Sequence, residues 1–103
     1  MTGSTREFTH PEAAGLELTS VLFALSDPIR LDLVRRLATE GSLEVAECHP
    51  PSGPLPKSTL SHHLKTLREA GLIRNVPHGR HRSLSLRRDD LDGRFPGLLD
   101  AVL

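Results

Sequence analysis

The stretch KSTLSHHLKTLREAGLI, residues 57–73, combines the periodicity of an α-helix with two adjacent histidines. Three leucines at positions i, i+4 and i+7 share one face of that helix, and they are Leu60, Leu64 and Leu67. Gly71 followed by Leu72 is the pattern of a left-handed helix cap with its apolar contact. The stretch therefore predicts a helix over residues 57–70 with its leucine face turned toward a core.

The opposite face of this helix is polar, and the two histidines belong to different faces. The polar residues are Lys57, Ser58, Ser61, His62 and Lys65. Because successive helical residues lie about 100° apart, His62 and His63 cannot readily bind one metal ion, for which a helix provides the spacing i, i+4. We therefore expect His62 to be available to a partner and His63 to pack beside the apolar face.

The residues before this stretch predict a loose arm and two helices. Residues 1–11 are polar and show no period, so they are expected to form a flexible arm. From Glu12 onward, apolar residues recur at helical spacing and predict a first helix. Its apolar face consists of Leu18, Val21, Leu22 and Leu25. A second helix is predicted over residues 28–40, because Ser26 or Asp27 can accept hydrogen bonds from its free N–H groups.

A third, short helix is predicted over residues 43–48. Ser42 can cap this helix. The four prolines within HPPSGPLP, residues 49–56, then end it, because proline lacks the N–H that a helix needs. The third helix, this turn and the helix over residues 57–70 would form a helix-turn-helix.

The last third of the chain predicts a basic hairpin and a terminal helix. Leucines alternate with polar residues in SLSL, and HGRH provides a turn, so residues 73–87 are expected to form a β-hairpin. Gly93 and Pro96 interrupt the final apolar stripe, which favours a short turn followed by a helix from Pro96. The elements together predict one mainly α domain over residues 12–103 with a small β-hairpin, arranged as a winged helix-turn-helix.

The chain has the length of a single small domain, and its charge is unevenly distributed. It has 103 residues, one cysteine and a formal net charge of zero. Residues 57–88 nevertheless carry eight Lys or Arg and one acid, whereas residues 1–56 and 89–103 have net charges of −4 and −3. An anionic partner at the middle segment would meet a positive field. No stretch resembles a membrane span or secretory signal, so we expect a cytoplasmic location and no membrane partner.

The polar helix and the basic hairpin indicate binding of double-stranded DNA. The major groove admits one α-helix, whose early residues can reach base edges and phosphates. The candidate DNA-binding residues of the helix are Lys57, Ser58, Thr59, Ser61, His62 and Lys65. Arg80 and Arg82 of the hairpin are candidates for the adjacent minor groove, which is narrow and strongly negative. No catalytic constellation, cofactor motif or metal-ligand spacing is present in the sequence, so enzymatic activity is not expected.

Three segments together resemble one protein family. The strings ALSDPIRLDLVRRL, STLSHHLKTLREAGLI and GRHRSLSL are similar to the second helix, the recognition helix and the wing of the ArsR/SmtB family of winged helix-turn-helix repressors. The resemblance covers residues 12–103. It implies a homodimer that pairs through its first and last helices, with two recognition helices in successive major grooves. It also implies that an inducer, which the sequence does not identify, relieves repression.

An apolar stripe near the C-terminus independently indicates self-association. A small chain has a limited interior, so we expect a second copy to cover this stripe and part of the first helix. The candidate dimer-interface residues are Leu18, Leu22, Phe95, Leu98, Leu99 and Val102. Packing of the stripe within one chain is the alternative.

Two other functions stay open on the sequence. Metal-sensing members of the family carry cysteine pairs before the recognition helix, or His and acidic ligands on the last helix. Here those places hold only Cys48 with His49, and Asp100. Cys48 could act as a thiol switch, or bind a metal together with His49 and His10 of the partner subunit, although an inert packing cysteine is the simpler expectation. The basic surface could instead bind an acidic protein.

Overall fold

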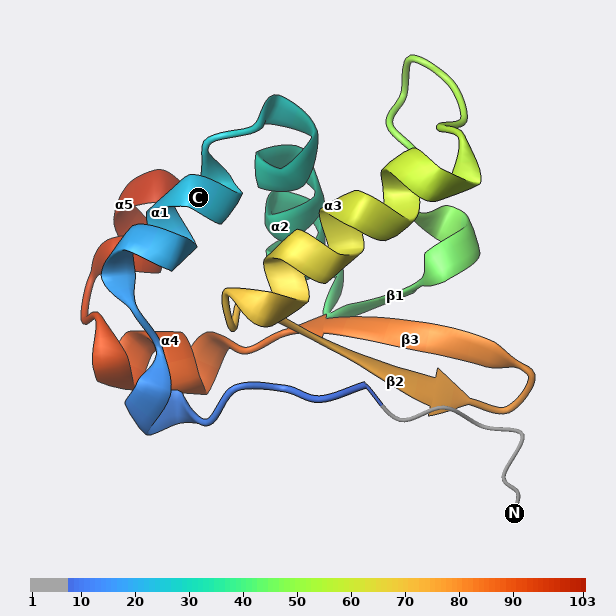
Figure 1. Cartoon of the computed structure of the whole chain (residues 1–103). Helices are drawn as coiled ribbons and strands as arrows, with labels where there is room; N and C mark the ends of the chain where they lie inside the picture. The colour runs from blue at the N-terminus through green and yellow to red at the C-terminus, as the bar shows by residue number, and fades with distance from the viewer. Residues whose placement is uncertain (1–7) are drawn as a thin grey trace.

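The computed structural model describes residues 8–103, in which α2 and α3 pack over a small antiparallel sheet (Figure 1). The elements, with η for a turn of 3-10 helix, are η1 (Ala13–Gly15), α1 (Leu18–Leu25), α2 (Pro28–Glu40), β1 (Ser42–Glu44), η2 (Val45–Glu47), α3 (Lys57–Glu69), β2 (Ile73–His78), β3 (His81–Leu86), α4 (Arg88–Arg94) and α5 (Leu98–Val102). The predicted fold class is confirmed. Within residues 8–103, no helix has the length and apolar character needed to cross a bilayer.

The first two helices form largely as predicted. α2 has the expected bounds, and the Asp27 carboxylate accepts hydrogen bonds from two backbone N–H groups of its first turn at 2.9 and 3.1 Å. α1 begins at Leu18 instead of Glu12, because residues 13–15 form a separate 3-10 turn. In Figure 1 the segment that holds this turn lies below α1. Because of the later start, α1 is only about two turns long.

The predicted third helix is wrong. Its first residues belong to β1, which pairs antiparallel with β3 and places Leu43 opposite Leu84, and η2 follows. A segment as short as residues 43–48 gains little from isolated helix formation, whereas the free edge of β3 can bind its backbone. Both leucines are buried. The sheet consequently has three strands, in the order β1-β3-β2.

α3 and its C-terminal cap agree closely with the sequence prediction. The three leucines of its apolar face are buried. Gly71 has φ 87°, and the N–H of Leu72 donates to the carbonyl of Leu67 at 3.0 Å. A Cβ at Gly71 would lie 2.1 Å from Cδ2 of Leu16, so the close approach of the two segments requires glycine as well. This cap fixes where α3 ends and β2 begins.

The hairpin is confirmed, and the C-terminal segment holds two short helices. β2 and β3 pair along their whole length, and Gly79 in the turn has φ 62°. α4 occupies residues that were expected to form a turn, and its Leu91 is fully buried. Gly97, with φ 84°, separates α4 from α5, which begins at Leu98 instead of Pro96.

The predicted arm packs onto the domain where the structure describes it. Residues 1–7 lie outside the described residues. Residues 8–11 are not loose: the His10 ring accepts a hydrogen bond from the Asn75 N–H at 3.0 Å, and a carbonyl of the segment accepts one from Arg87 at 2.7 Å. The segment lies beside β2 (Figure 1). The sequence did not predict these contacts, because the two partners of each hydrogen bond are far apart along the chain.

Candidate nucleic-acid interface

The polar face of α3 is exposed along its length. All six predicted contact residues of this helix are exposed, namely Lys57, Ser58, Thr59, Ser61, His62 and Lys65. In Figure 1, α3 crosses the front of the molecule, and its first turn points to the same side as the end of the hairpin. The predicted orientation is confirmed, because these side chains project from one helix whose other face is held in the core. That they contact DNA stays a prediction.

The start of α3 is suited to binding anions. Pro56 occupies the N-cap position, and no side chain there accepts a hydrogen bond from the first-turn N–H groups. Such N–H groups and the helix dipole favour phosphate near a helix N-terminus. Lys57 adds a positive charge at the same end.

The buried side of α3 is anchored by an arginine of α2. Arg30 is only 7% exposed, and its Nη1 lies 3.1 Å from Nδ1 of His63. The same guanidinium donates to two carbonyls of α1, that of Ala24 at 2.8 Å and that of Phe23 at 3.4 Å. Because arginine can only donate, His63 Nδ1 is the acceptor and the ring is neutral in this arrangement. One side chain thus joins α1, α2 and α3.

The surroundings of His63 explain why its role differs from that of exposed His62. Burial lowers the pKa of His63; Asp27, whose Oδ2 lies 4.0 Å from Nδ1, raises it, and the positive charge of Arg30 lowers it again. The net result is a pKa below the ordinary value of 6.5. Sequence reasoning predicted the packing of His63 but missed Arg30. The available signal was that Arg30 shares a helical face with Leu33, Val34 and Leu37.

The two hairpin arginines lie in different environments. Arg80 is exposed in the turn between β2 and β3. Arg82 instead folds against the sheet, where its Nε donates to Asn75 Oδ1 at 2.8 Å and its Nη2 donates to the Asn75 carbonyl at 3.0 Å. Its guanidinium carbon also lies 4.2 Å from the centre of the Phe8 ring. The prediction of an arginine at the turn tip therefore holds for Arg80 and is wrong for Arg82.

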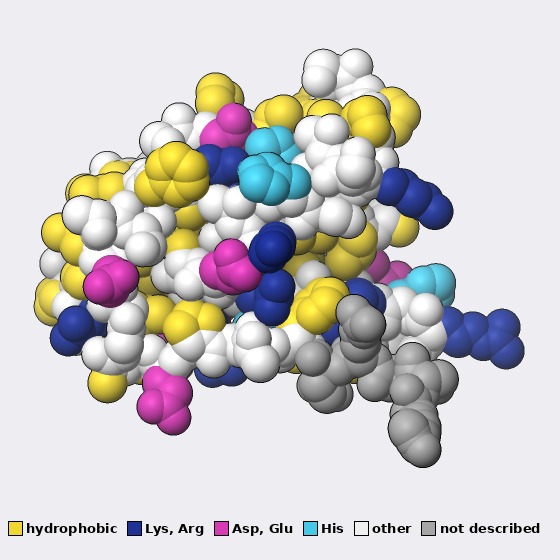
Figure 2. Space-filling model, viewed as in Figure 1, with side chains coloured by type: hydrophobic (Ala, Val, Ile, Leu, Met, Phe, Trp, Pro, Cys, Tyr) yellow, Lys and Arg dark blue, Asp and Glu magenta, His cyan; other side chains and the backbone are white. Residues whose placement is uncertain are grey.

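Part of the positive charge of the basic segment is paired with acids of α4. Arg74 and Arg87 lie 3.3 and 3.0 Å from Asp90, and Arg88 lies 3.2 Å from Asp92. The exposed cations on α3 and in the hairpin turn are Lys57, Lys65 and Arg80. Figure 2 shows dark blue side chains projecting at the right edge, over the start of α3 and the end of the hairpin. The net charge counted over residues 57–88 therefore overstates the positive field at α3. The exposed cations nevertheless lie on α3 and the hairpin turn, where the sequence predicted a positive surface.

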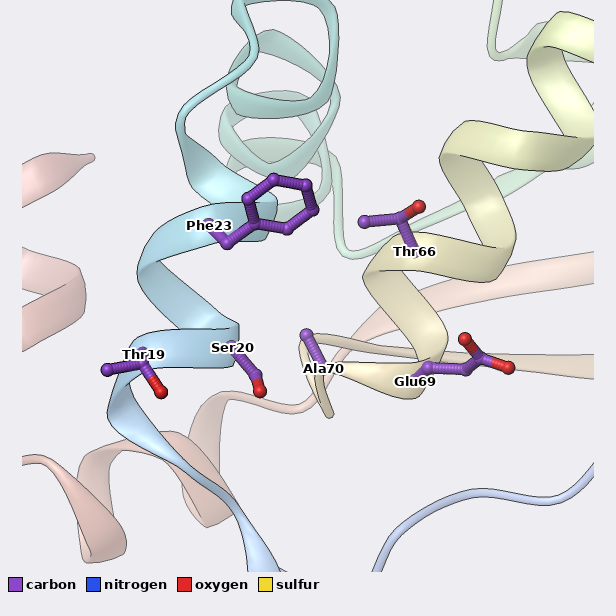
Figure 3. A pocket seen from close by; sticks show the side chains of 6 residues that line it. All are labelled: Thr19, Ser20, Phe23, Thr66, Glu69 and Ala70. Atoms are coloured by element: carbon purple, nitrogen blue, oxygen red, sulfur yellow. The ribbon is translucent and has the colours of Figure 1, made fainter.

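A second exposed surface, on α1, is apolar. Leu18 and Leu22 are each 44% exposed, and Phe23, which sequence reasoning did not single out, is 65% exposed. Figure 3 shows Phe23 on α1 across a shallow groove from α3. Thr19 and Ser20 line the groove from α1, and Thr66, Glu69 and Ala70 line it from α3. The predicted apolar face of α1 is thus divided between the core and the surface.

The C-terminal residues of the predicted dimer set are divided in the same way. Phe95, Leu98 and Val102 are partly buried against the core. Leu99 is fully buried within the chain, so it holds α5 in place and presents no surface to a partner. The prediction that Leu99 lies in a dimer interface is therefore wrong. On an amphipathic helix such as α5, one position faces the core of its own chain while its neighbours lie nearer the surface.

Cys48 is a packed, protonated thiol. It is 3% exposed, and its Sγ donates to the Glu44 carbonyl at 3.3 Å. Burial raises its pKa to about 11, which disfavours the thiolate that oxidants and metals attack. His49 is engaged elsewhere, because its Nδ1 accepts from the Leu55 N–H at 3.0 Å. Among residues 8–103, no three His, Cys, Asp or Glu side chains converge as metal ligands.

Known proteins share both the sequence and the fold of this region. A family model described as a helix-turn-helix domain matches residues 25–76. The chain is 39% identical over 80 residues to the uncharacterized HTH-type transcriptional regulator YceK of Bacillus subtilis (strain 168). The aligned region spans 77% of this chain and 79% of that protein.

Solved structures share the fold over 76 to 82% of this chain. A possible transcriptional regulator for arsenical resistance matches with a TM-score of 0.63 at 30% identity, over 82% of this chain and 84% of the other. The transcriptional repressor BigR from Xylella fastidiosa matches with a TM-score of 0.58 at 28% identity, over 76% of this chain and 85% of BigR. An ArsR family transcriptional regulator has the same fold, with a TM-score of 0.65 at 24% identity over 82% of this chain and 84% of the other.

A core-anchored helix with an exposed polar face, followed by a β-hairpin whose second strand also pairs with β1, defines a winged helix-turn-helix DNA-binding protein. The chain belongs to the ArsR family of these transcriptional regulators. Its relatives are transcriptional regulators and not enzymes, which confirms the prediction that it has no catalytic function.

Proposed function

We propose that two copies of this chain form a symmetric dimer that binds an inverted-repeat operator in double-stranded DNA and represses transcription beside it. The observation that carries the proposal is the exposed polar face of α3, which Arg30 anchors from behind. A helix fixed in this way can enter a major groove without rearrangement of the core. We expect the protein to act in the cytoplasm, where its operator lies.

The contacts in each half-site follow from the placement of the side chains. Short polar groups in the first two turns of α3 face the base edges, and these are Ser58, Thr59, Ser61 and His62. Lys57 and Lys65 bind phosphates on either side of them, and the free N–H groups at the start of α3 add to the anion site. Arg80, at the end of the wing, reaches the neighbouring minor groove. Arg82 supports the wing from within.

The apolar surface of α1 supports the dimer. Leu18, Leu22 and Phe23 remain exposed in the single chain, which is unfavourable unless a partner covers them. A two-fold axis would bring the same surface of each copy together. Phe95, Leu98 and Val102 provide further apolar edges near the C-terminus.

Repression is the mode of action that the relatives favour. BigR is described as a transcriptional repressor, and a dimer seated on an operator excludes other proteins from that DNA. We propose that an inducer relieves this block by lowering the affinity for DNA.

Selection of bound sequences from a random DNA pool tests the proposal. The expected product is an inverted repeat with half-site centres about 34 Å apart, bound with an affinity that falls steeply as salt increases. If random and selected DNA competed equally, sequence-specific regulation would be ruled out. The basic surface would then be better explained as a binding site for an acidic protein.

A further inference from the structure

A cavity of about 290 Å³ lies between α3, the sheet and Phe8. Its apolar lining comes from Phe8, Val45 and Leu64. Its polar lining includes three cationic side chains, those of Lys65, Arg68 and Arg82. No carboxylate is among the described residues that line it. An apolar interior with cations on one side is the arrangement that suits an organic anion.

The three cations have different roles in this cavity. The guanidinium carbons of Arg68 and Arg82 lie 4.5 and 4.2 Å from the centre of the Phe8 ring, so they hold the aromatic wall in place. Arg68 Nη1 also donates to the Thr9 carbonyl at 2.9 Å. Lys65 is exposed, and its side chain forms no ion pair or hydrogen bond within residues 8–103. Its ammonium is therefore the group best placed to receive a ligand.

We propose that this cavity binds a small organic monocarboxylate and that the bound anion lowers the affinity of the protein for DNA. The apolar body of the ligand displaces water from Phe8, Val45 and Leu64, and its carboxylate pairs with Lys65. Ligand pockets usually have volumes from roughly 300 Å³ upward, so a cavity of this size restricts the body to one or two rings or a short alkyl chain.

The effect on DNA follows from residues that serve two surfaces. Ser61 and Lys65 line the cavity and also belong to the exposed face of α3. A carboxylate paired with Lys65 removes that cation from phosphate. This step rests on the proposed function, for which it supplies the chemical class of the inducer. By linkage, DNA and anion weaken each other's binding by the same factor.

Fluorescence titration of the full chain with 1-naphthoate, in the absence of DNA, tests the cavity. The matched probe is 1-naphthylmethylammonium, which carries the opposite charge on the same ring system. We expect saturable binding of naphthoate that is about tenfold tighter than that of the cation, the ratio expected from one charge-assisted hydrogen bond. Equal affinities, or tighter binding of the cation, would overturn the proposal.

Three variants show whether binding occurs in this cavity. Val45→Phe fills it without a change of charge and should weaken naphthoate about tenfold, the effect of losing roughly 1.4 kcal/mol of apolar contact. Lys65→Gln, at an exposed position that leaves the core intact, should weaken naphthoate by a similar factor. Arg74→Gln removes an arginine that does not line the cavity and should leave the affinity within about twofold. Wild-type affinity in Lys65→Gln would refute the proposal even if Val45→Phe failed to fold.

A titration with selected operator DNA separates this inference from the proposed function. Saturating naphthoate should weaken operator binding about tenfold, and it should cause no further loss in Lys65→Gln, which already lacks the shared cation. If operator and naphthoate bound independently, the inducer role would be excluded. If the chain bound no DNA specifically, the proposed function would fail, and the anion preference measured without DNA would stand.

Discussion

The α3 surface and the α1 surface differ in the kind of side chain that they leave exposed. On α3 and the hairpin turn, the exposed groups form hydrogen bonds or carry positive charge, and water satisfies them in the single chain. On α1, the exposed groups include the apolar side chains of Leu18, Leu22 and Phe23, which water does not satisfy. The first surface is therefore stable as it stands and ready for an anionic partner. The second lowers its free energy only when another apolar surface covers it.

Arg30 connects these two surfaces. Its guanidinium donates to two carbonyls of α1 and to His63 on the buried side of α3. This side chain therefore helps to fix the relative position of α1 and α3, in addition to their apolar packing. A change at Arg30 should disturb both surfaces, whereas a change on either surface should disturb only that one.

The largest effect is expected from Arg30→Ala. The substitution leaves two carbonyls and His63 without their donor in a mostly buried place, which should lower the free energy of unfolding by about 3 kcal/mol. Urea unfolding followed by circular dichroism measures this loss. The control is Arg35→Ala on the same helix, whose exposed guanidinium makes one bond to the Val102 carbonyl and should contribute less than about 0.5 kcal/mol. Similar losses of unfolding free energy in both variants would show that the contacts of Arg30 with α1 and α3 are not important for stability.

The next effect tests the apolar surface alone. Leu22→Glu should weaken dimer formation by about 2 kcal/mol, because a carboxylate would have to be desolvated where a leucine side chain was covered. The monomer should still fold, since this side chain is already 44% exposed. Sedimentation velocity over a range of concentrations gives the association constant. Ala38→Glu, at an exposed position of α2, is the matched control. A dimer unaffected by Leu22→Glu would place the interface elsewhere and remove the contrast between the surfaces.

The parts of the fold that the sequence predicted depend on neighbouring residues. The cap of α2 by Asp27, the left-handed cap at Gly71 and the hairpin turn at Gly79 each need only a few adjacent positions. The exposed face of α3 also follows from its own periodicity. These local signals were enough to predict which face of α3 is exposed, and that this face contacts DNA stays a prediction.

The parts that the sequence did not predict depend on partners far along the chain. Residues 43–48 favoured a helix locally, but β3 supplied a strand edge to pair with. Arg82 was expected at the turn tip, but Asn75 and Phe8 hold it against the sheet. Leu99 shared a stripe with exposed residues, and only the packing of α5 shows which member of the stripe is buried. Periodicity identifies a face but does not identify what covers it.

A third prediction tests the polar surface alone. Lys65→Gln should weaken operator binding about tenfold and reduce the slope of affinity against salt by about one ion, as expected for loss of one phosphate contact. Arg74→Gln is the control, because Arg74 lies next to Asp90 and away from the exposed face of α3. Fluorescence anisotropy at several salt concentrations measures both quantities. The same small loss in the two variants would mean that a diffuse charge, and not α3, attracts the DNA.

The prediction with the smallest expected effect compares His62 and His63, which are adjacent in the sequence but lie on different faces of α3. The pKa of His63 is lowered by burial and by Arg30 despite the opposing charge of Asp27, so the unfolded chain binds this proton more readily than the folded chain. The free energy of unfolding should therefore fall as the pH decreases through 6.5, the ordinary value. His10, whose pKa is also lowered by burial, contributes with the same sign, so the comparison is with His63→Gln, which retains His10.

The difference in stability between the wild-type chain and His63→Gln should change across this pH range, and thermal unfolding at several pH values measures it. His62→Gln should leave that profile unchanged, because His62 is exposed. Operator affinity should instead respond to His62→Gln, since His62 lies on the exposed face of α3 that we propose contacts DNA. If His62→Gln altered the stability profile and His63→Gln did not, the assignment of the two histidines to a DNA-facing and a core-facing side of α3 would be reversed.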